Sequence, residues 1–146
     1  MLFILGIASA GVSGHAANLY LIGMGPGDPD LATVKAMRLV READIIYVLS
    51  RDLLERFEQQ LRGKDVRDLS GQSVTRYYTR KAKPGAVKDK GAGAKIGEAN
   101  RQALIRDVKE AVSKEKTVVF LDSGDPLIFG PWVWLLREFG ETGMEV

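Results

Sequence analysis

The chain has 146 residues, of which 45% are hydrophobic and 27% charged, a composition typical of one globular domain. It contains no cysteine, which excludes disulfides, thiolate metal sites and cysteine nucleophiles, and its single histidine, His15, cannot build a histidine-rich metal site. The net charge of +2 gives no reason to expect nucleic acid as a partner. We therefore expect neither a bound metal nor a polyelectrolyte ligand.

The first 17 residues form an apolar, small-residue segment that ends like the cleavage site of a secretory signal. No Lys or Arg precedes the apolar run, whereas secretory signals usually begin with one, and the run is too short to cross a bilayer as a helix. Residues 1–17 are therefore either a cleaved signal of an exported, periplasmic protein or an extended leader of a cytoplasmic one. The fold is argued from residues 18–146.

Short apolar runs alternate along the chain with segments whose apolar residues recur at helical spacing. The predicted strands are 19–22, 44–49 and 117–121, with weaker candidates at 66–69 and 74–78 and the start of a further strand at 144–146. The predicted helices are 29–43, 50–62, 98–113 and 131–139. This alternation indicates an α/β fold with a mainly parallel sheet flanked by helices.

Residues 79–97 are dense in Lys, Gly and Ala, and the segment predicts a long loop. Several cations gather in and beside it: Arg76, Arg80, Lys81, Lys83, Lys88, Lys90 and Lys95. A flexible cationic flap would attract an acidic ligand, and an ordinary solvated loop explains the same composition.

Two glycine-bearing turns follow predicted strands, and both contain the tripeptide Gly-Asp-Pro, at 27–29 and 124–126. In each, the Asp suits a helix N-cap and the Pro a first helical position. The carboxyl ends of parallel strands are where open α/β sheets bind ligands, so we expect a ligand site at these turns, with purely structural loops as the alternative. The first turn is no dinucleotide fingerprint, because Asp28 stands where the third glycine is required.

The second turn offers two kinds of polar group to a ligand. Ser123 and Gly124 leave the backbone accessible, and Asp125 suits an amino group or ribose hydroxyls, or else acts as a plain helix cap.

Residues 19–36, with Gly-Met-Gly-Pro-Gly-Asp-Pro, residues 43–47, and residues 118–130, with Asp-Ser-Gly-Asp-Pro-Leu-Ile-Phe-Gly, resemble the tetrapyrrole (corrin/porphyrin) methylase family. The order and separation of the blocks agree as well. In that family two α/β domains enclose S-adenosylmethionine. The resemblance thus implies that residues 18–146 are the N-terminal domain and that the C-terminal domain is missing from this sequence.

The chemistry that the resemblance implies is methyl transfer from S-adenosylmethionine to a carbon of a tetrapyrrole, in porphyrin or cobalamin biosynthesis. It also implies a homodimer, and a fragment that is inactive alone. The cofactor contacts carried over are Pro26, Ser123, Gly124 and Asp125, with Ile128 packing nearby. Ser123 departs from the glycine common at its position, a small change that preserves access to the backbone.

The chain also departs from the family where a catalytic residue is expected. The uroporphyrinogen branch has an Asp just after the second strand, whereas Asp52 comes three residues too late to align, so no catalytic residue is assigned. This departure keeps two alternatives open: the RNA- or protein-methylating branch of the superfamily, and a non-catalytic binding module that retains the fold.

Overall fold

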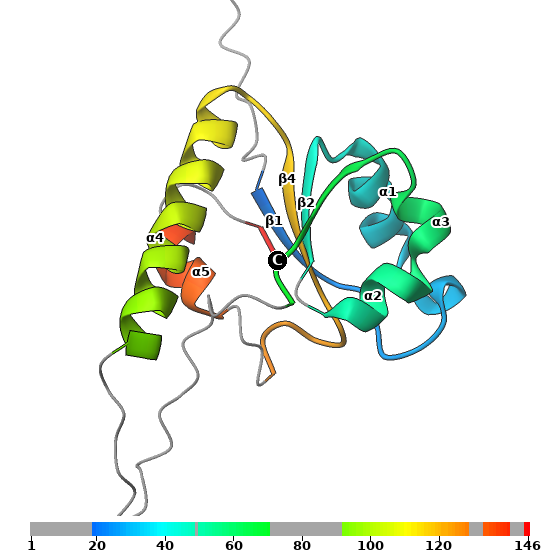
Figure 1. The fold of residues 1–146 in the computed structure, drawn as a ribbon. Helices are drawn as coiled ribbons and strands as arrows, with labels where there is room; N and C mark the ends of the chain where they lie inside the picture. Colours follow the sequence, from blue (N-terminus) through cyan, green and yellow to red (C-terminus); the bar gives the residue numbers. More distant parts are fainter. Residues whose placement is uncertain (1–18, 49, 71–91, 129–132, 141–144) are drawn as a thin grey trace, which may run out of the picture.

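The computed structural model describes residues 19–48, 50–70, 92–128, 133–140 and 145–146 (Figure 1). The leader at 1–17, the weak strand predicted at 74–78 and most of the predicted basic loop lie outside the described residues.

A four-stranded, entirely parallel sheet forms the centre of the domain, in the order β1-β4-β2-β3. The strands are β1 (Leu19–Gly23), β2 (Ile45–Val48), β3 (Asp65–Asp68) and β4 (Val118–Asp122). Every residue of β2 and β4 is buried, because helices cover both faces of these strands. The parallel α/β architecture predicted from the sequence is confirmed.

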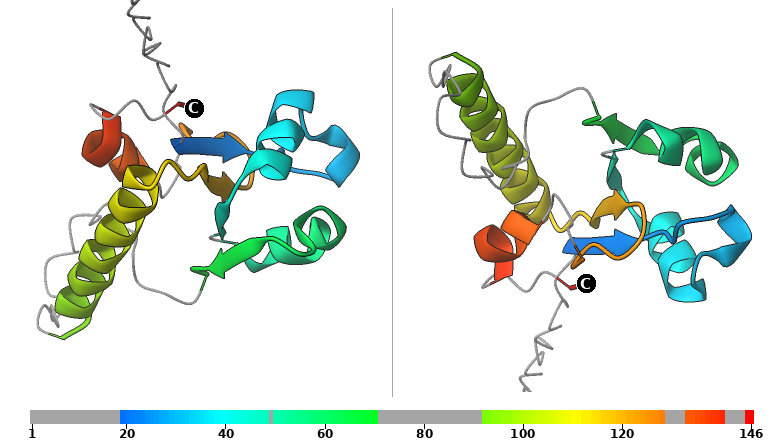
Figure 2. Two further views of the ribbon diagram at one scale, coloured as in Figure 1. Left: turned by 90° about the horizontal axis from the view of Figure 1, so that it is seen from above. Right: turned by 90° about the horizontal axis from the view of Figure 1, so that it is seen from below.

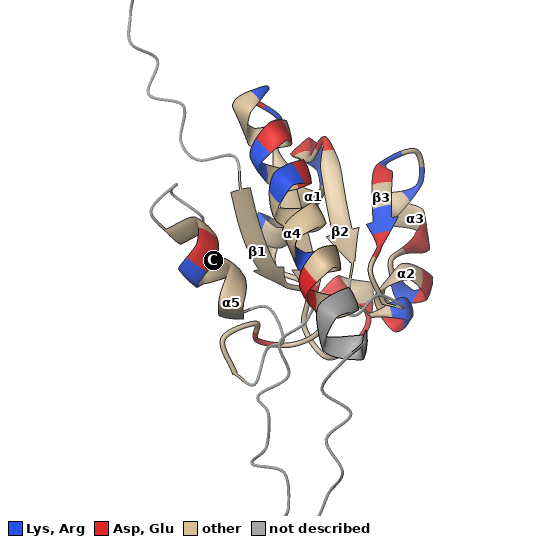
Figure 3. Cartoon of the chain, turned by 60° about the vertical axis from the view of Figure 1, so that its left-hand side comes forward, with Lys and Arg blue, Asp and Glu red and all other residues tan. Residues whose placement is uncertain are grey.

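Helices pack on the two faces of the sheet and enclose separate hydrophobic cores (Figures 1 and 2). One face carries α4 (Ala92–Ser113) and α5 (Val133–Phe139); the other carries α1 (Val34–Glu42), α2 (Arg51–Arg56) and α3 (Glu58–Leu61). Alternate strand residues point to alternate faces: Tyr47 and Phe120 stack at 4.9 Å between ring centroids on the α4 side, whereas Ile46 and Leu121 join the other core. Strands β1 and β2 carry no charge, while α4 exposes charges of both signs (Figure 3).

The first predicted helix is only partly correct. Pro29–Leu31 forms a single 3₁₀ turn, and the α-helix begins at Val34, five residues later than expected. Thr33 is the true N-cap, since its Oγ1 accepts a hydrogen bond from the Ala36 amide at 3.1 Å, whereas the Asp28 side chain makes no capping bond.

Two other helical boundaries also differ from the prediction. The predicted helix at 50–62 is interrupted at buried Phe57, whose φ of −106° and ψ of 20° divide it into α2 and α3. The predicted loop at 79–97 is wrong over its last six residues, because α4 already begins at Ala92.

The predicted start of a further strand is confirmed at Glu145, which pairs in parallel with Tyr20 on the outer edge of β1. The Leu21 amide donates to the Glu145 carbonyl at 2.9 Å, and the Glu145 amide donates to the Leu19 carbonyl at 3.0 Å. Across the described ranges, no helix combines the length and the apolar composition needed to cross a membrane.

Candidate functional site

The two glycine turns begin side by side at the carboxyl edge of the sheet. Strands β1 and β4 are neighbours, and Gly23 and Asp122 are paired in register at their ends. The Met24 amide then donates to the Asp122 carbonyl at 2.9 Å, which extends the pairing into the turns. The structure thus brings together two segments that lie about a hundred residues apart in the sequence.

Close contact between the turns depends on Gly23. A Cβ at this position would lie 2.2 Å from the Gly124 carbonyl oxygen and 2.9 Å from Cδ of Pro126, both far inside van der Waals contact. Gly124 itself has a φ of +86°, a conformation that favours glycine. The glycines therefore let the two backbones approach more closely than any side chain would permit.

A hollow of about 320 Å³ lies beside the meeting point of the turns. Its walls come from β1, α1, the second turn and the strand start at Glu145, and its lining residues are Tyr20, Leu21, Ile22, Gly23, Thr33, Lys35, Ala36, Leu39, Gly124, Asp125, Pro126, Glu145 and Val146. The floor is largely apolar, and Lys35 and Glu145 form an exposed ion pair at 3.9 Å. A mainly apolar hollow with a few polar groups at its border is the usual form of a small-molecule site.

The cofactor contacts implied by the resemblance fall into two sets. Gly124 and Asp125 line the hollow, whereas Pro26, Ser123 and Ile128 lie on the same two turns and are exposed without lining it. Ile128 is 65% exposed.

Asp125 does not cap a helix, which corrects one of the sequence interpretations. Its Oδ1 accepts a hydrogen bond from the Leu127 amide at 2.8 Å, and its carbonyl accepts from Ile128 at 3.2 Å, so it shapes a tight turn. Residues 129–132 lie outside the described residues, and α5 begins only at Val133.

Asp122 is a buried carboxylate beside the site that the sequence interpretation did not single out. It ends β4 where the two turns begin and does not line the hollow. It is only 6% exposed, and its side chain accepts a hydrogen bond from the Ser123 amide at 2.8 Å. Burial raises the pKa of its carboxyl, and the negative charge of nearby Asp52 raises it further. The only sequence signal was a carboxylate at the end of an otherwise apolar run.

Asp52, the carboxylate that fails to align with the family, is tied into a polar chain on α2. It accepts hydrogen bonds from the Ser50 hydroxyl and, at 2.8 Å, from Arg56, whose guanidinium also donates to the carbonyl oxygen of Gly27 in the first turn. No group of three or more metal-ligating side chains that could hold an ion occurs within the described part of the chain.

The fold is an open, parallel α/β domain whose two glycine turns meet at the carboxyl edge of the sheet, the edge at which such domains bind their ligands. Comparison with known proteins gives the particular family. Residues 18–146 match the family described as Tetrapyrrole (Corrin/Porphyrin) Methylases, and the chain belongs to this family.

Curated relatives in this family carry out related methylations. The chain is 34% identical over 116 residues to the cobalt-precorrin-4 C(11)-methyltransferase of Priestia megaterium, covering 77% of this chain and 33% of the relative. It is 34% identical over 121 residues to the S-adenosyl-L-methionine-dependent uroporphyrinogen III methyltransferase of Methanosarcina barkeri, covering 82% of this chain and 38% of the relative. The chain thus spans only about a third of the length of each relative.

Solved structures support the fold. A cobalt precorrin-4 methyltransferase superposes with a TM-score of 0.59 at 22% identity, over 93% of this chain and 47% of that one. The uroporphyrin-III C-methyltransferase of Thermus thermophilus, solved with S-adenyl homocysteine, superposes with a TM-score of 0.51 at 25% identity, over 88% of this chain and 42% of that one.

Proposed function

We propose that residues 18–146 form the N-terminal domain of an S-adenosylmethionine-dependent methyltransferase that acts on a tetrapyrrole, a corrin or porphyrin precursor. The observation that carries the proposal is the contact between the two glycine turns beside the hollow, in a chain that belongs to this family. The relatives from Priestia megaterium and Methanosarcina barkeri, a cobalt-precorrin-4 and a uroporphyrinogen III methyltransferase, support the tetrapyrrole as substrate class.

The residues present fit S-adenosylmethionine. Gly124 would offer open backbone, and the exposed carboxylate of Asp125 would accept hydrogen bonds from an amino group or from ribose hydroxyls. Pro26 and Ser123 would contact the cofactor from the two turns, and Ile128 would pack against it. When bound, the cofactor supplies an electrophilic methyl group on a sulfonium.

The protein's contribution to such a displacement is positioning within a dry cleft. The register between β1 and β4 fixes the two turns relative to each other, and a bound cofactor would rest on the largely apolar floor of the hollow. Beyond positioning, such a displacement needs a catalytic group of the protein only where the acceptor must lose a proton, which a base would take up.

A second domain would complete the cleft, and we propose that one belongs to the active protein. The segments that follow the two turns expose large apolar side chains, with Leu31 at 66%, Val34 at 84% and Leu127 at 54% exposure. A further domain packed beside the turns would bury these side chains. We accordingly expect the 146-residue chain alone to bind the cofactor weakly and to have no activity, and we expect a cytoplasmic homodimer, as the family resemblance implies.

The alternative is a non-catalytic binding module that retains the fold. It is favoured by Asp52, whose side chain is paired with Arg56 rather than aligned as a base. A methyl-transfer assay separates the two functions, because a binding module would take up the cofactor without forming a methylated product.

The proposal is tested by calorimetry with S-adenosylhomocysteine on this chain and on a longer version that carries a second domain. We expect binding to the longer protein, and a loss of at least tenfold in affinity when Asp125 is changed to Ala. The matched control is Asp30→Ala, which removes an exposed carboxylate outside the lining of the hollow. Failure of both proteins to bind would overturn the cofactor assignment.

The substrate class is tested separately, by incubating the longer protein with S-adenosylmethionine and uroporphyrinogen III or a precorrin and analysing the products by mass spectrometry. Cofactor binding with no methylated tetrapyrrole would overturn the proposed substrate and favour the binding module or another methylase branch.

A further inference from the structure

We propose that Arg56 is a positioning residue that holds the first glycine turn in its ligand-binding form, an inference that rests on the proposed function. Arg56 ends α2, and its side chain is only 23% exposed. Its Nη1 donates a hydrogen bond to the carbonyl oxygen of Gly27, which lies 29 residues earlier in the chain. The contact therefore joins the helix after β2 to the turn after β1.

The first turn needs such a contact because its own backbone is permissive. Gly25 has a φ of +79°, and glycine has access to many other conformations, so the turn is not fixed by local preference. Backbone hydrogen bonds hold its two ends, from Met24 to Asp122 at 2.9 Å and from Leu31 to Asp28 at 3.0 Å. The Arg56 bond reaches the stretch between these ends, beside Pro26.

Arg56 is itself fixed from the other side. Its Nη2 lies 2.8 Å from Oδ2 of Asp52, and the other carboxylate oxygen of Asp52, Oδ1, accepts from the Ser50 hydroxyl. The guanidinium carbon lies 5.8 Å from the centre of the Phe57 ring, and Phe57 is buried in the core. The planar guanidinium can serve the carbonyl and the carboxylate at once, whereas the single ammonium of a lysine is poorly suited to both.

The same polar chain lies near the end of β4. Arg56 pairs with Asp52, and the negative charge of Asp52 contributes to raising the pKa of the buried Asp122 carboxyl. The side chains of Ser50, Asp52 and Arg56 thus connect the start of α2 to the backbone of the first turn. This arrangement gives Arg56 a role in the site although it does not line the hollow.

The positioning role is tested first without any ligand, by NMR of the 146-residue chain. The variants are Arg56→Gln and Arg56→Lys, with Arg62→Gln as the matched control, because Arg62 pairs with Glu58 at the same helical spacing, at 3.6 Å, but is 74% exposed. We expect Arg56→Gln to shift the Gly27 carbonyl resonance and to lower the amide order parameters of Gly25 and Gly27. Arg62→Gln should leave both turns unchanged, and Arg56→Lys should give an intermediate response.

The second measurement is the affinity of the longer protein for S-adenosylhomocysteine. We expect Arg56→Gln to weaken binding about tenfold, Arg56→Lys to recover part of the loss, and Arg62→Gln to bind like wild type. Unchanged Gly27 signals in Arg56→Gln would overturn the inference, and so would altered turn signals with wild-type affinity. If the wild-type protein binds no S-adenosylhomocysteine, the proposed function fails, and the response of Gly27 alone decides whether Arg56 holds the turn.

Discussion

Asp122 is a carboxyl whose ionisation the fold opposes. It is nearly fully buried at the end of β4, and burial, together with the charge of Asp52, raises its pKa above the ordinary value of 3.8. A group whose pKa is higher in the folded than in the unfolded state binds its proton more tightly when folded. Its contribution to stability is therefore complete below pH 3.8 and is lost as the pH rises through the raised folded value.

We accordingly predict that Asp122→Asn stabilises the domain at neutral pH. The asparagine side chain keeps an oxygen that accepts the hydrogen bond from the backbone amide of Ser123, but it removes the free-energy cost of burying a charge. Urea unfolding from pH 3.5 to 8 should give a free energy of unfolding that exceeds that of wild type at pH 7, with a difference that shrinks toward the acid end. Parallel pH profiles for the two proteins would contradict this prediction.

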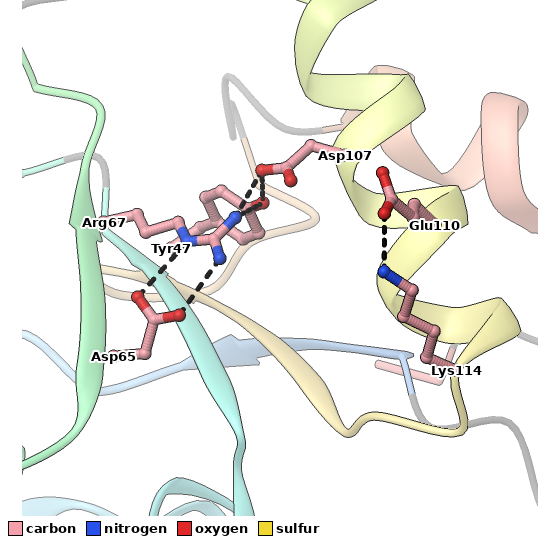
Figure 4. Close-up of polar contacts among 6 residues, drawn as sticks. All are labelled: Tyr47, Asp65, Arg67, Asp107, Glu110 and Lys114. Carbon is pink, nitrogen blue, oxygen red and sulfur yellow. Dashed lines mark hydrogen bonds and ion pairs between the residues drawn. The ribbon is translucent and has the colours of Figure 1, made fainter.

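Tyr47 illustrates a buried hydroxyl that joins a helix to the sheet. Its hydroxyl donates to Asp107 of α4 and accepts from Arg67 of β3 at 2.9 Å, and Arg67 also pairs with Asp65 at 3.0 Å (Figure 4). Burial, and then the hydrogen bond to Asp107, raises the pKa of Tyr47 well above its usual range. The hydroxyl is therefore neutral and acts as a donor at every physiological pH.

Removing the Tyr47 hydroxyl measures how much its hydrogen bonds to Asp107 and Arg67 contribute to the stability of the domain. We predict that Tyr47→Phe lowers the free energy of unfolding by about 1.5–3 kcal/mol, the usual contribution of a hydrogen bond to a charged group. Burial raises the pKa of Asp107, but the bonds from Tyr47 and Arg67 outweigh it and lower that pKa, so the effect should diminish as acid protonates Asp107. The control is Tyr20→Phe, which removes a hydroxyl from a partly exposed side chain on β1. Equal losses in the two variants would contradict the assignment.

The start of a helix depends on which side chain accepts a hydrogen bond from its first backbone amides. Helix α1 begins after Thr33 and not after Asp28, because the Thr33 side chain accepts from the Ala36 amide whereas the Asp28 side chain makes no capping bond. We predict that Thr33→Ala destabilises the domain by about 1 kcal/mol, whereas Thr33→Ser retains most of the stability. Thermal unfolding followed by circular dichroism measures both, and an equally large loss in the serine variant would contradict the capping role.

Strands β2 and β4 were predictable from the sequence because burial on both faces leaves a continuous apolar run at 45–48 and 118–121. Strand β3 gave a weaker signal, because its four residues include Asp65, Arg67 and Asp68 and are only partly buried. The helix boundaries were less predictable, because they depend on which of several polar residues captures a free backbone amide. The interruption at Phe57 depends on tertiary packing, since this residue leaves helical geometry while its ring remains in the core.

The candidate site was predictable to the extent that its residues lie on the glycine turns. Gly124 and Asp125 could be singled out because local turn chemistry marks them. Asp122 and Arg56 could not, since their roles depend on contacts with Asp52 and Gly27 that only the folded chain creates. The sequence pattern therefore identifies residues whose role follows from local turn conformation, and it misses residues whose role depends on interactions with distant segments of the chain.

At the scale of the whole molecule, the site exists because of strand order. The chain places β4 between β1 and β2, so the turn that follows the last described strand comes to lie beside the turn that follows the first. Parallel pairing then aligns their carboxyl ends, as in other open α/β sheets. The pattern of apolar runs predicts the strands but not which strands are neighbours, because pairing depends on contacts between segments far apart in the sequence.

The contact at Gly23 tests whether the two turns act as one unit. We predict that Gly23→Ala destabilises the domain by about 1–3 kcal/mol, because the added methyl group would overlap the carbonyl of Gly124 and the ring of Pro126 and must push the turns apart. The control is Gly140→Ala, where a Cβ meets nothing within 4 Å.

Urea unfolding measures the loss of stability, and NMR of Gly124 and its neighbours in Gly23→Ala reports the movement of the second turn. If the variant folds, its affinity for S-adenosylhomocysteine in the longer protein should fall together with the displacement, since both turns carry proposed contacts. A displaced second turn with unchanged affinity would mean that the cofactor does not require the two turns to meet. An undisturbed second turn would mean that the first turn alone gives way, and that the register of β1 and β4 does not transmit strain between them.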